Sequence, residues 1–125
     1  MTGLLLMGLA SLHLVTADVS GAAVPTCQAT AEGPTFGLGT GLMYFHFTTT
    51  CDAVVNAITV NASVDGPRQD RSGSKTCVDS STCTYVLSVP YARGTWLWTN
   101  ASAIVSQPSS KSVPLSATNA VTYSQ

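Results

Sequence analysis

Apolar and polar residues alternate with a period of two along most of the chain after residue 24, a pattern typical of β-strands with one buried face. In residues 42–50 the alternation places Met43, Phe45 and Phe47 on one face and mainly polar side chains on the other. No segment shows a helical period. The same alternation predicts further strands at residues 26–31, 54–64, 84–89, 95–105 and 113–123.

The segments between these strands are rich in Gly, Pro, Ser and Asn, which favour turns. Residues 37–41 form a glycine-rich loop, and Asp65-Gly66-Pro67 supplies a turn. Residues 68–75 hold three of the five basic residues of the chain. We expect residues 68–75 to form an exposed loop or an edge strand whose polarity prevents aggregation.

The two faces of the segment 95–105 compete for the core. Trp96 and Trp98 share one face with polar Asn100 and Ser102, whereas leucine, alanine and valine residues occupy the other face. A β-bulge could let Trp96 and the later alanines both face the core.

About seven short antiparallel strands in about 100 residues predict an all-β domain. Their aromatic and β-branched inner faces favour an immunoglobulin-like, two-sheet antiparallel sandwich with two disulfides over the alternative, a closed barrel.

The start of the chain has the character of a secretory signal peptide. Residues 4–15 are an apolar run too short to span about 30 Å of hydrocarbon, and small residues follow it. We expect cleavage after Ala22 or Ala23, with Ala17 as an earlier option. Residues 1–23 would then be the signal and residues 24–125 a single secreted domain without a membrane span. The alternative is that residues 4–15 form a core strand or helix.

Four cysteines, at positions 27, 51, 77 and 83, remain after the predicted cleavage. An even count in a short exported chain indicates two disulfides. The five residues between Cys77 and Cys83 fit a hairpin whose flanking positions lie at bridging distance, which favours that pair. The pair Cys27–Cys51 follows by elimination. A zinc site would need a different cysteine spacing, so no metal is expected.

Composition narrows the possible functions. The 125 residues include 5 Lys and Arg against 6 Asp and Glu, a net charge of −1. Such a balance offers no basic patch for nucleic acid. Beyond the leader His46 is the single histidine, and the acidic residues fall in predicted turns. We therefore expect no enzyme, no catalytic residue and no cofactor.

Two sets of residues are candidates for binding. Trp96 and Trp98 stand at alternate positions of one strand, so their indoles would lie side by side and form a platform for sugar rings, unless they belong to the core. Arg68, Arg71 and Arg93 lie in loops, where a disulfide-braced domain could present them to the cleft of an enzyme.

Asn61-Ala62-Ser63 and Asn100-Ala101-Ser102 match the acceptor pattern for N-glycans. They would carry glycans only in a eukaryotic host.

Three short motifs resemble small exported actinobacterial proteins. They are Ile58-Thr59-Val60, the Cys77 to Cys83 hairpin, and Gly94-Thr95-Trp96. The resemblance implies a secreted immunoglobulin-like domain of unknown function, and it transfers no functional residue.

We therefore expect a secreted, non-enzymatic extracellular module that binds the cell envelope or another surface ligand, either cell-wall polysaccharide or a secreted protein. The alternative is a proteinaceous inhibitor of a secreted hydrolase.

Overall fold

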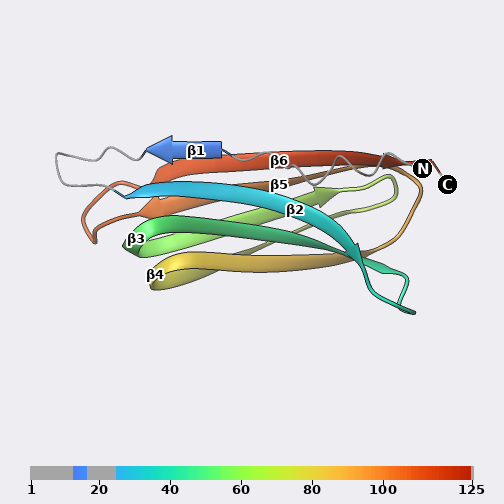
Figure 1. Cartoon of the computed structure of the whole chain (residues 1–125), viewed down its shortest axis with the longest axis horizontal. Coiled ribbons are helices and arrows are strands. Elements are labelled where there is room, and N and C mark those ends of the chain that lie inside the picture. The colour runs from blue at the N-terminus through green and yellow to red at the C-terminus, as the bar shows by residue number, and fades with distance from the viewer. Residues whose placement is uncertain (1–12, 17–24, 125) are drawn as a thin grey trace.

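The structure, a computed structural model of the chain, describes residues 13–16 and 25–124. These residues form an all-β fold with six strands and no helix (Figure 1). The strands are β1 (His13–Thr16), β2 (Thr26–Phe36), β3 (Leu42–Asp65), β4 (Asp70–Pro90), β5 (Gly94–Val105) and β6 (Val113–Tyr123). Within the described ranges there is no helix long and apolar enough to cross a membrane.

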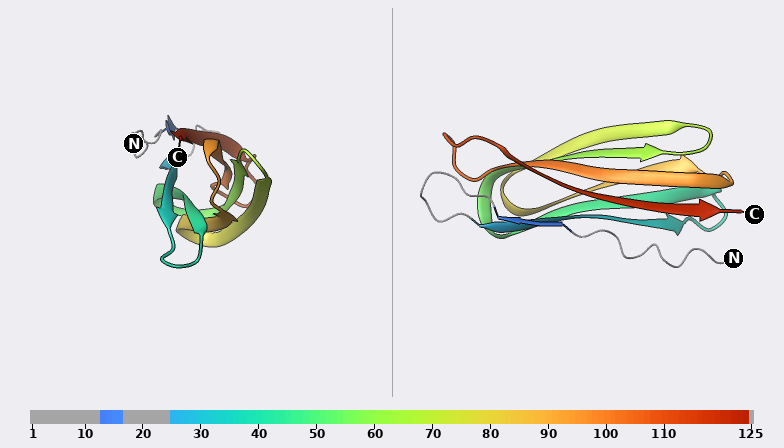
Figure 2. Two further views of the ribbon diagram at one scale, coloured as in Figure 1. Left: turned by 90° about the vertical axis from the view of Figure 1, so that its right-hand side faces the viewer. Right: turned by 90° about the horizontal axis from the view of Figure 1, so that it is seen from above.

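All strands pair antiparallel, in the order β1-β2-β3-β5-β6, and β4 also pairs with β3. The long strand β3 takes part in two regions of the sheet. Residues 42–50 lie between β2 and the second half of β4, and residues 57–65 lie between β5 and the first half of β4. The sheet therefore curls until its inner faces oppose each other (Figure 2).

The predicted strands at residues 42–50 and 54–64 are two parts of one continuous strand with a bend between them. The register of β3 against β4 shifts between Thr50 and Val55, and such an irregularity bends a strand without ending it. Residues 68–75 and 84–89 are likewise joined, from Asp70 onward, within β4. The described residues thus contain six strands, two of them far longer than predicted, instead of about seven short ones.

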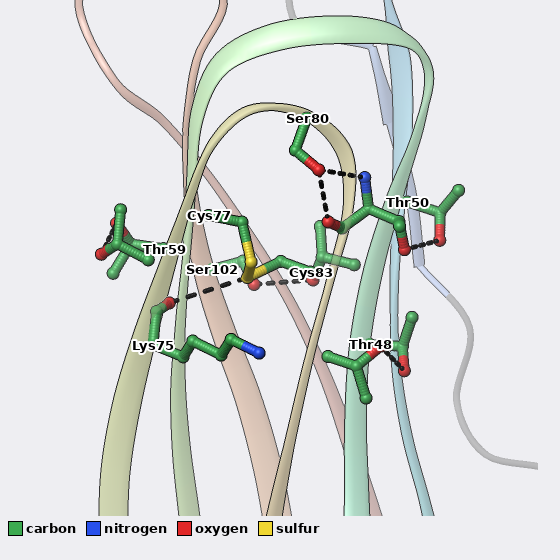
Figure 3. Close-up of a disulfide and its surroundings, with 12 residues drawn as sticks. Thr48, Thr50, Thr59, Lys75, Cys77, Ser80, Cys83 and Ser102 are labelled. Carbon is green, nitrogen blue, oxygen red and sulfur yellow. Dashed lines mark hydrogen bonds between the residues drawn. A yellow bond between two sulfur atoms is a disulfide. The ribbon is translucent and has the colours of Figure 1, made fainter.

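Both predicted disulfides are confirmed. Cys27 and Cys51 face each other across β2 and β3 and are bonded. Cys77 is bonded to Cys83 across the bend of β4, where Asp79 adopts a left-handed φ of 48° (Figure 3). Aspartate tolerates this conformation better than most residues.

The inner faces of the curled sheet form one core. The alternation of residues 26–31, 42–50 and 54–64 gives each segment an apolar inward side, and these inward side chains are buried: Cys27, Ala29, Ala31, Met43, Phe45, Phe47, Ile58, Val60, Ala62 and Val64. The largest fully buried apolar side chains are Trp96, Trp98, Phe45, Phe47, Met43, Ile58 and Ile104.

The bulge considered for residues 95–105 is absent. Strand β5 pairs with β3 and β6 without a register shift. Its buried face carries both tryptophans together with Asn100 and Ser102, while Leu97 is 40% exposed. The polar pair is accommodated because its hydrogen-bonding groups are satisfied inside the core, so no bulge is needed to turn it to water.

Asn100 is the centre of this buried network. Its Nδ2 donates to the carbonyl oxygens of Thr30 at 3.0 Å and Thr48 at 3.1 Å, and to Oγ1 of Thr49 at 3.1 Å. Its Oδ1 accepts from Oγ of Ser102 at 2.7 Å, and that hydroxyl also lies 2.7 Å from Oγ1 of Thr49. One side chain of β5 thereby connects β2 and β3 through the core.

Strand β1 pairs with the start of β2, from His13 opposite Ala29 to Thr16 opposite Thr26. These four residues belong to the segment predicted as a signal peptide. The predicted cleavage positions, Ala17, Ala22 and Ala23, lie outside the described residues, so processing remains a prediction.

Candidate functional site

Three aromatic side chains from distant parts of the sequence meet at one end of the fold. Phe36 ends β2, Tyr91 follows β4, and Tyr123 ends β6. We call Phe36, Tyr91, Tyr123 and the neighbouring Leu38 the aromatic end. It lies with the turns of residues 37–41, 66–69 and 91–93, at the right-hand side of Figure 1.

The three rings contact one another edge to face or at a tilt. The ring centroid of Phe36 lies 6.2 Å from that of Tyr91 and 5.9 Å from that of Tyr123, and the two tyrosine centroids are 5.8 Å apart. Aromatic pairs with these separations and angles attract each other beyond their burial of area. The three rings therefore pack as one cluster, and part of its surface faces water.

Much of the aromatic end is exposed to solvent. Phe36 is 53% exposed, Tyr91 39% and Leu38 96%, while Tyr123 is half-buried against the core. Burial raises the pKa of Tyr123, and the neighbouring Tyr91 adds to the rise.

Backbone hydrogen bonds fix the segments that carry these residues. The turn of residues 37–41 closes through Gly37 N–H, which donates to Leu42 O at 3.0 Å. Positive φ angles at Gly39 and Gly41, 72° and 74°, let the chain reverse there. Tyr91 N–H donates to Gly41 O at 3.0 Å, so the connection after β4 is attached to this turn.

Arg68 and Arg93 lie on two neighbouring turns at the same end. The turn of Arg68 contains Pro67, and a Cβ added at Gly94 would lie 2.8 Å from Cβ of that proline. Glycine at position 94, with φ of 127°, therefore allows the two turns to touch. Both arginines are exposed, and Arg71 is exposed on β4. Two of the three arginines singled out from the sequence thus lie on turns that touch each other at this end of the fold.

Trp96 and Trp98 do not form a surface platform, because they are 1% and 0% exposed. Phe45 packs between them, with ring centroids 5.8 Å from Trp96 and 4.9 Å from Trp98. Trp96 Nε1 donates to Ala92 O at 2.9 Å, whereas Trp98 Nε1 has no hydrogen-bond partner among the described residues. Their large apolar area makes both indoles core residues.

The two glycan acceptor motifs differ in accessibility. Asn100 is fully buried with its amide nitrogen engaged, so the folded chain offers no acceptor there. Asn61 is exposed on the outer face of β3, beside a shallow depression of about 470 Å³ shared with Ser72 and Ala101.

His46 Nε2 lies 3.3 Å from Oγ1 of Thr35 on the outer face of the sheet. Within residues 13–16 and 25–124, no three His, Cys, Asp or Glu side chains gather in a geometry that could hold a metal ion.

Sequence reasoning missed the aromatic end. Its residues are isolated in the sequence and lie next to turns, and only the topology brings the ends of β2, β4 and β6 together. Their positions next to turns suggested exposure, but single exposed aromatic residues are normal on protein surfaces and do not mark a site.

No model of a known protein family matches the chain, and no curated protein matches its sequence. Among solved structures, chicken MD-1 in complex with lipid IVa aligns over 92% of this chain and 99% of its own, with 8% sequence identity and a TM-score of 0.33. A likeness of this size assigns neither a fold family nor a ligand.

Proposed function

We propose that the protein is a secreted, non-enzymatic binding module with an immunoglobulin-like two-sheet architecture, and that the aromatic end is its ligand surface. The ligand is a polysaccharide of the cell envelope. The observation that carries this function is the gathering of Phe36, Tyr91 and Tyr123 from three separate segments into one partly exposed cluster.

Two features support an extracellular setting and the architecture. All four cysteines are paired, and disulfides persist in oxidising environments such as the cell exterior. The bends of β3 and β4 divide the curled sheet into two opposed regions around one core, which is the arrangement of a sandwich.

The chemistry of the aromatic end supports a sugar ligand. Aromatic rings pack against the C–H faces of sugars, and tyrosine hydroxyls supply hydrogen bonds at the same place. Arg68 and Arg93 add exposed donors on the adjoining turns. An exposed apolar patch bordered by polar residues is a common sign of an interaction site.

Inhibition of a secreted hydrolase is the second candidate, and one observation favours it. The turns that carry Arg68 and Arg93 touch through Pro67 and Gly94, so two cations project from a braced end of the domain. A cleft with acidic residues would accept such a pair.

Cosedimentation of the secreted protein with washed cell-wall fragments tests the first function. We expect the double variant Phe36→Ala, Tyr91→Ala to bind at least about tenfold more weakly, which corresponds to about 1.4 kcal/mol. The matched control is Val54→Ala, Val78→Ala, which removes two exposed apolar side chains, 67% and 65% exposed, at the bends. It should bind as the wild type does.

Undiminished wall binding by the aromatic double variant would refute the assignment. Capture of one hydrolase from culture medium, lost in Arg68→Ala, Arg93→Ala, would establish the inhibitor instead.

A further inference from the structure

The outer edge of β2 is occupied in this chain by a segment that the mature protein is predicted to lose. Strand β1 covers residues 26–29 of β2 in an antiparallel register. Cleavage after Ala22 or Ala23 would remove β1, and the backbone groups on that edge of β2 would then lack their partners. An open edge is a template for another strand.

Two hydrogen bonds define which groups face this edge. Thr26 N–H donates to Oδ1 of Asp52 on β3 at 3.1 Å. Because backbone groups of successive residues alternate in direction along a strand, those of Cys27 and Ala29 point away from β3, to the edge. At Ala31 this edge meets β6, since Ala31 O accepts from Nδ2 of Asn119 at 3.3 Å. The open segment is therefore residues 26–30.

This segment has none of the usual protection against edge pairing. It contains no charged residue and no proline, whereas the edge formed by the first half of β4 carries Asp70, Arg71 and Lys75. Proteins normally place charge or proline on exposed edges to prevent association.

We propose that the processed chain forms a twofold dimer in which β2 of one copy pairs antiparallel with β2 of another, centred on Gln28. Cys27 then stands opposite Ala29 of the second copy, and each such pair exchanges both N–H···O bonds. These are the same positions of β2 that pair with Val15 and His13 of β1. A second copy fits because the pattern of edge-directed groups is symmetric about Gln28, as a twofold interface requires.

The side chains on both faces suit this pairing. On the outer face Thr26 of the second copy stands opposite Thr30. Within one copy Thr30 is paired with Thr48 of β3, and Thr48 is paired with Thr84 of β4, so the threonines form a row across the strands. Oγ1 of Thr48 already lies 3.2 Å from Oγ1 of Thr84, and cross-strand threonine pairs stabilise sheets. On the inner face Ala29 is small, and the Cys27 side chain is held in its disulfide.

Sedimentation velocity of the secreted protein over a range of concentrations tests the dimer, with intact mass to define its N-terminus. We expect a dimer fraction that rises with concentration. Gln28 is half-buried on the outer face and meets its own copy at the twofold axis, so Gln28→Lys and Gln28→Glu each place like charges together. Either variant alone should be monomeric, and an equimolar mixture should recover the dimer. Thr82→Lys, on the same outer face but away from the edge, should dimerise as the wild type does.

A wild type that stays monomeric at every concentration, or a dimer that Gln28→Lys leaves intact, would overturn the proposal. So would a secreted chain that retains residues 13–16. Circular dichroism of each variant separates lost pairing from lost folding.

Discussion

Replacing Asn100 by alanine removes the side chain that connects β5 to β2 and β3 inside the core. Asn100 is 0% exposed, and the substitution leaves the backbone untouched. It deletes the bonds that its amide nitrogen donates to Thr30, Thr48 and Thr49, and the bond that its oxygen accepts from Ser102.

The loss of stability follows from this inventory. An intramolecular hydrogen bond contributes about 1 kcal/mol net, and a buried group left without a partner costs about 1–3 kcal/mol. The hydroxyls of Thr49 and Ser102 keep each other as partners at 2.7 Å. We therefore expect Asn100→Ala to lower the free energy of unfolding by about 3–4 kcal/mol, a large share of the 5–15 kcal/mol typical of a domain.

Urea unfolding followed by tryptophan fluorescence measures this change, with the slope m checked for constancy. Asn61→Ala is the matched control, because Asn61 is exposed on the neighbouring strand. The control should lie within about 0.5 kcal/mol of the wild type. If Asn100→Ala lost no more stability than Asn61→Ala, the buried network would not be what holds the polar face of β5 in the core.

Three further predictions concern the disulfides and the aromatic residues. Cys77→Ser with Cys83→Ser should cost about 2.5 kcal/mol in urea unfolding, from the entropy of the short loop they close; an unchanged midpoint would contradict this. Trp96 and Trp98 should resist iodide quenching in the folded protein, since both are buried. The raised pKa of Tyr123 keeps its phenol neutral to higher pH in the folded state than in the unfolded chain. The contribution of Tyr123 to the free energy of unfolding is therefore fully present below about pH 10 and is lost as the pH rises through the pKa of the folded state. Tyrosinate absorbance, with Tyr123→Phe as reference, measures that pKa.

The alternating pattern predicted the faces of most strands correctly. The buried positions of residues 43–47 and 58–64 follow directly from a period of two, because the inward face of each of these stretches is apolar. The pairing of Cys77 with Cys83 could be predicted from the sequence because the two residues are only six positions apart and lie on either side of one bend.

The pattern failed where the core contains polar groups. In β5 the tryptophans share a face with Asn100 and Ser102, and burial of two indoles outweighs the cost of burying two polar side chains whose hydrogen bonds are satisfied. The three acceptors of the Asn100 amide nitrogen are 51 to 70 residues away in the sequence. No local pattern reports contacts of that range.

The candidate site could not be predicted from local sequence patterns either, because its residues are far apart in the sequence. Phe36, Tyr91 and Tyr123 are brought together by the order of the strands. The bends of β3 and β4 place the ends of β2 and β6 beside the connection that follows β4 (Figure 2). Their exposure could be suspected from turn neighbours, but their contact could not.

Hydroxyl-radical footprinting of the protein bound to washed cell-wall fragments tests the central claim most directly, because it reports which side chains the ligand covers. We predict that Phe36, Tyr91 and Tyr123 are oxidised more slowly in the bound protein than in the free protein. Val54 and Val78, exposed at the bends, should be oxidised at equal rates in both. Unchanged oxidation of the three aromatic residues in a protein that is demonstrably bound would contradict the assignment of the aromatic end as the ligand surface.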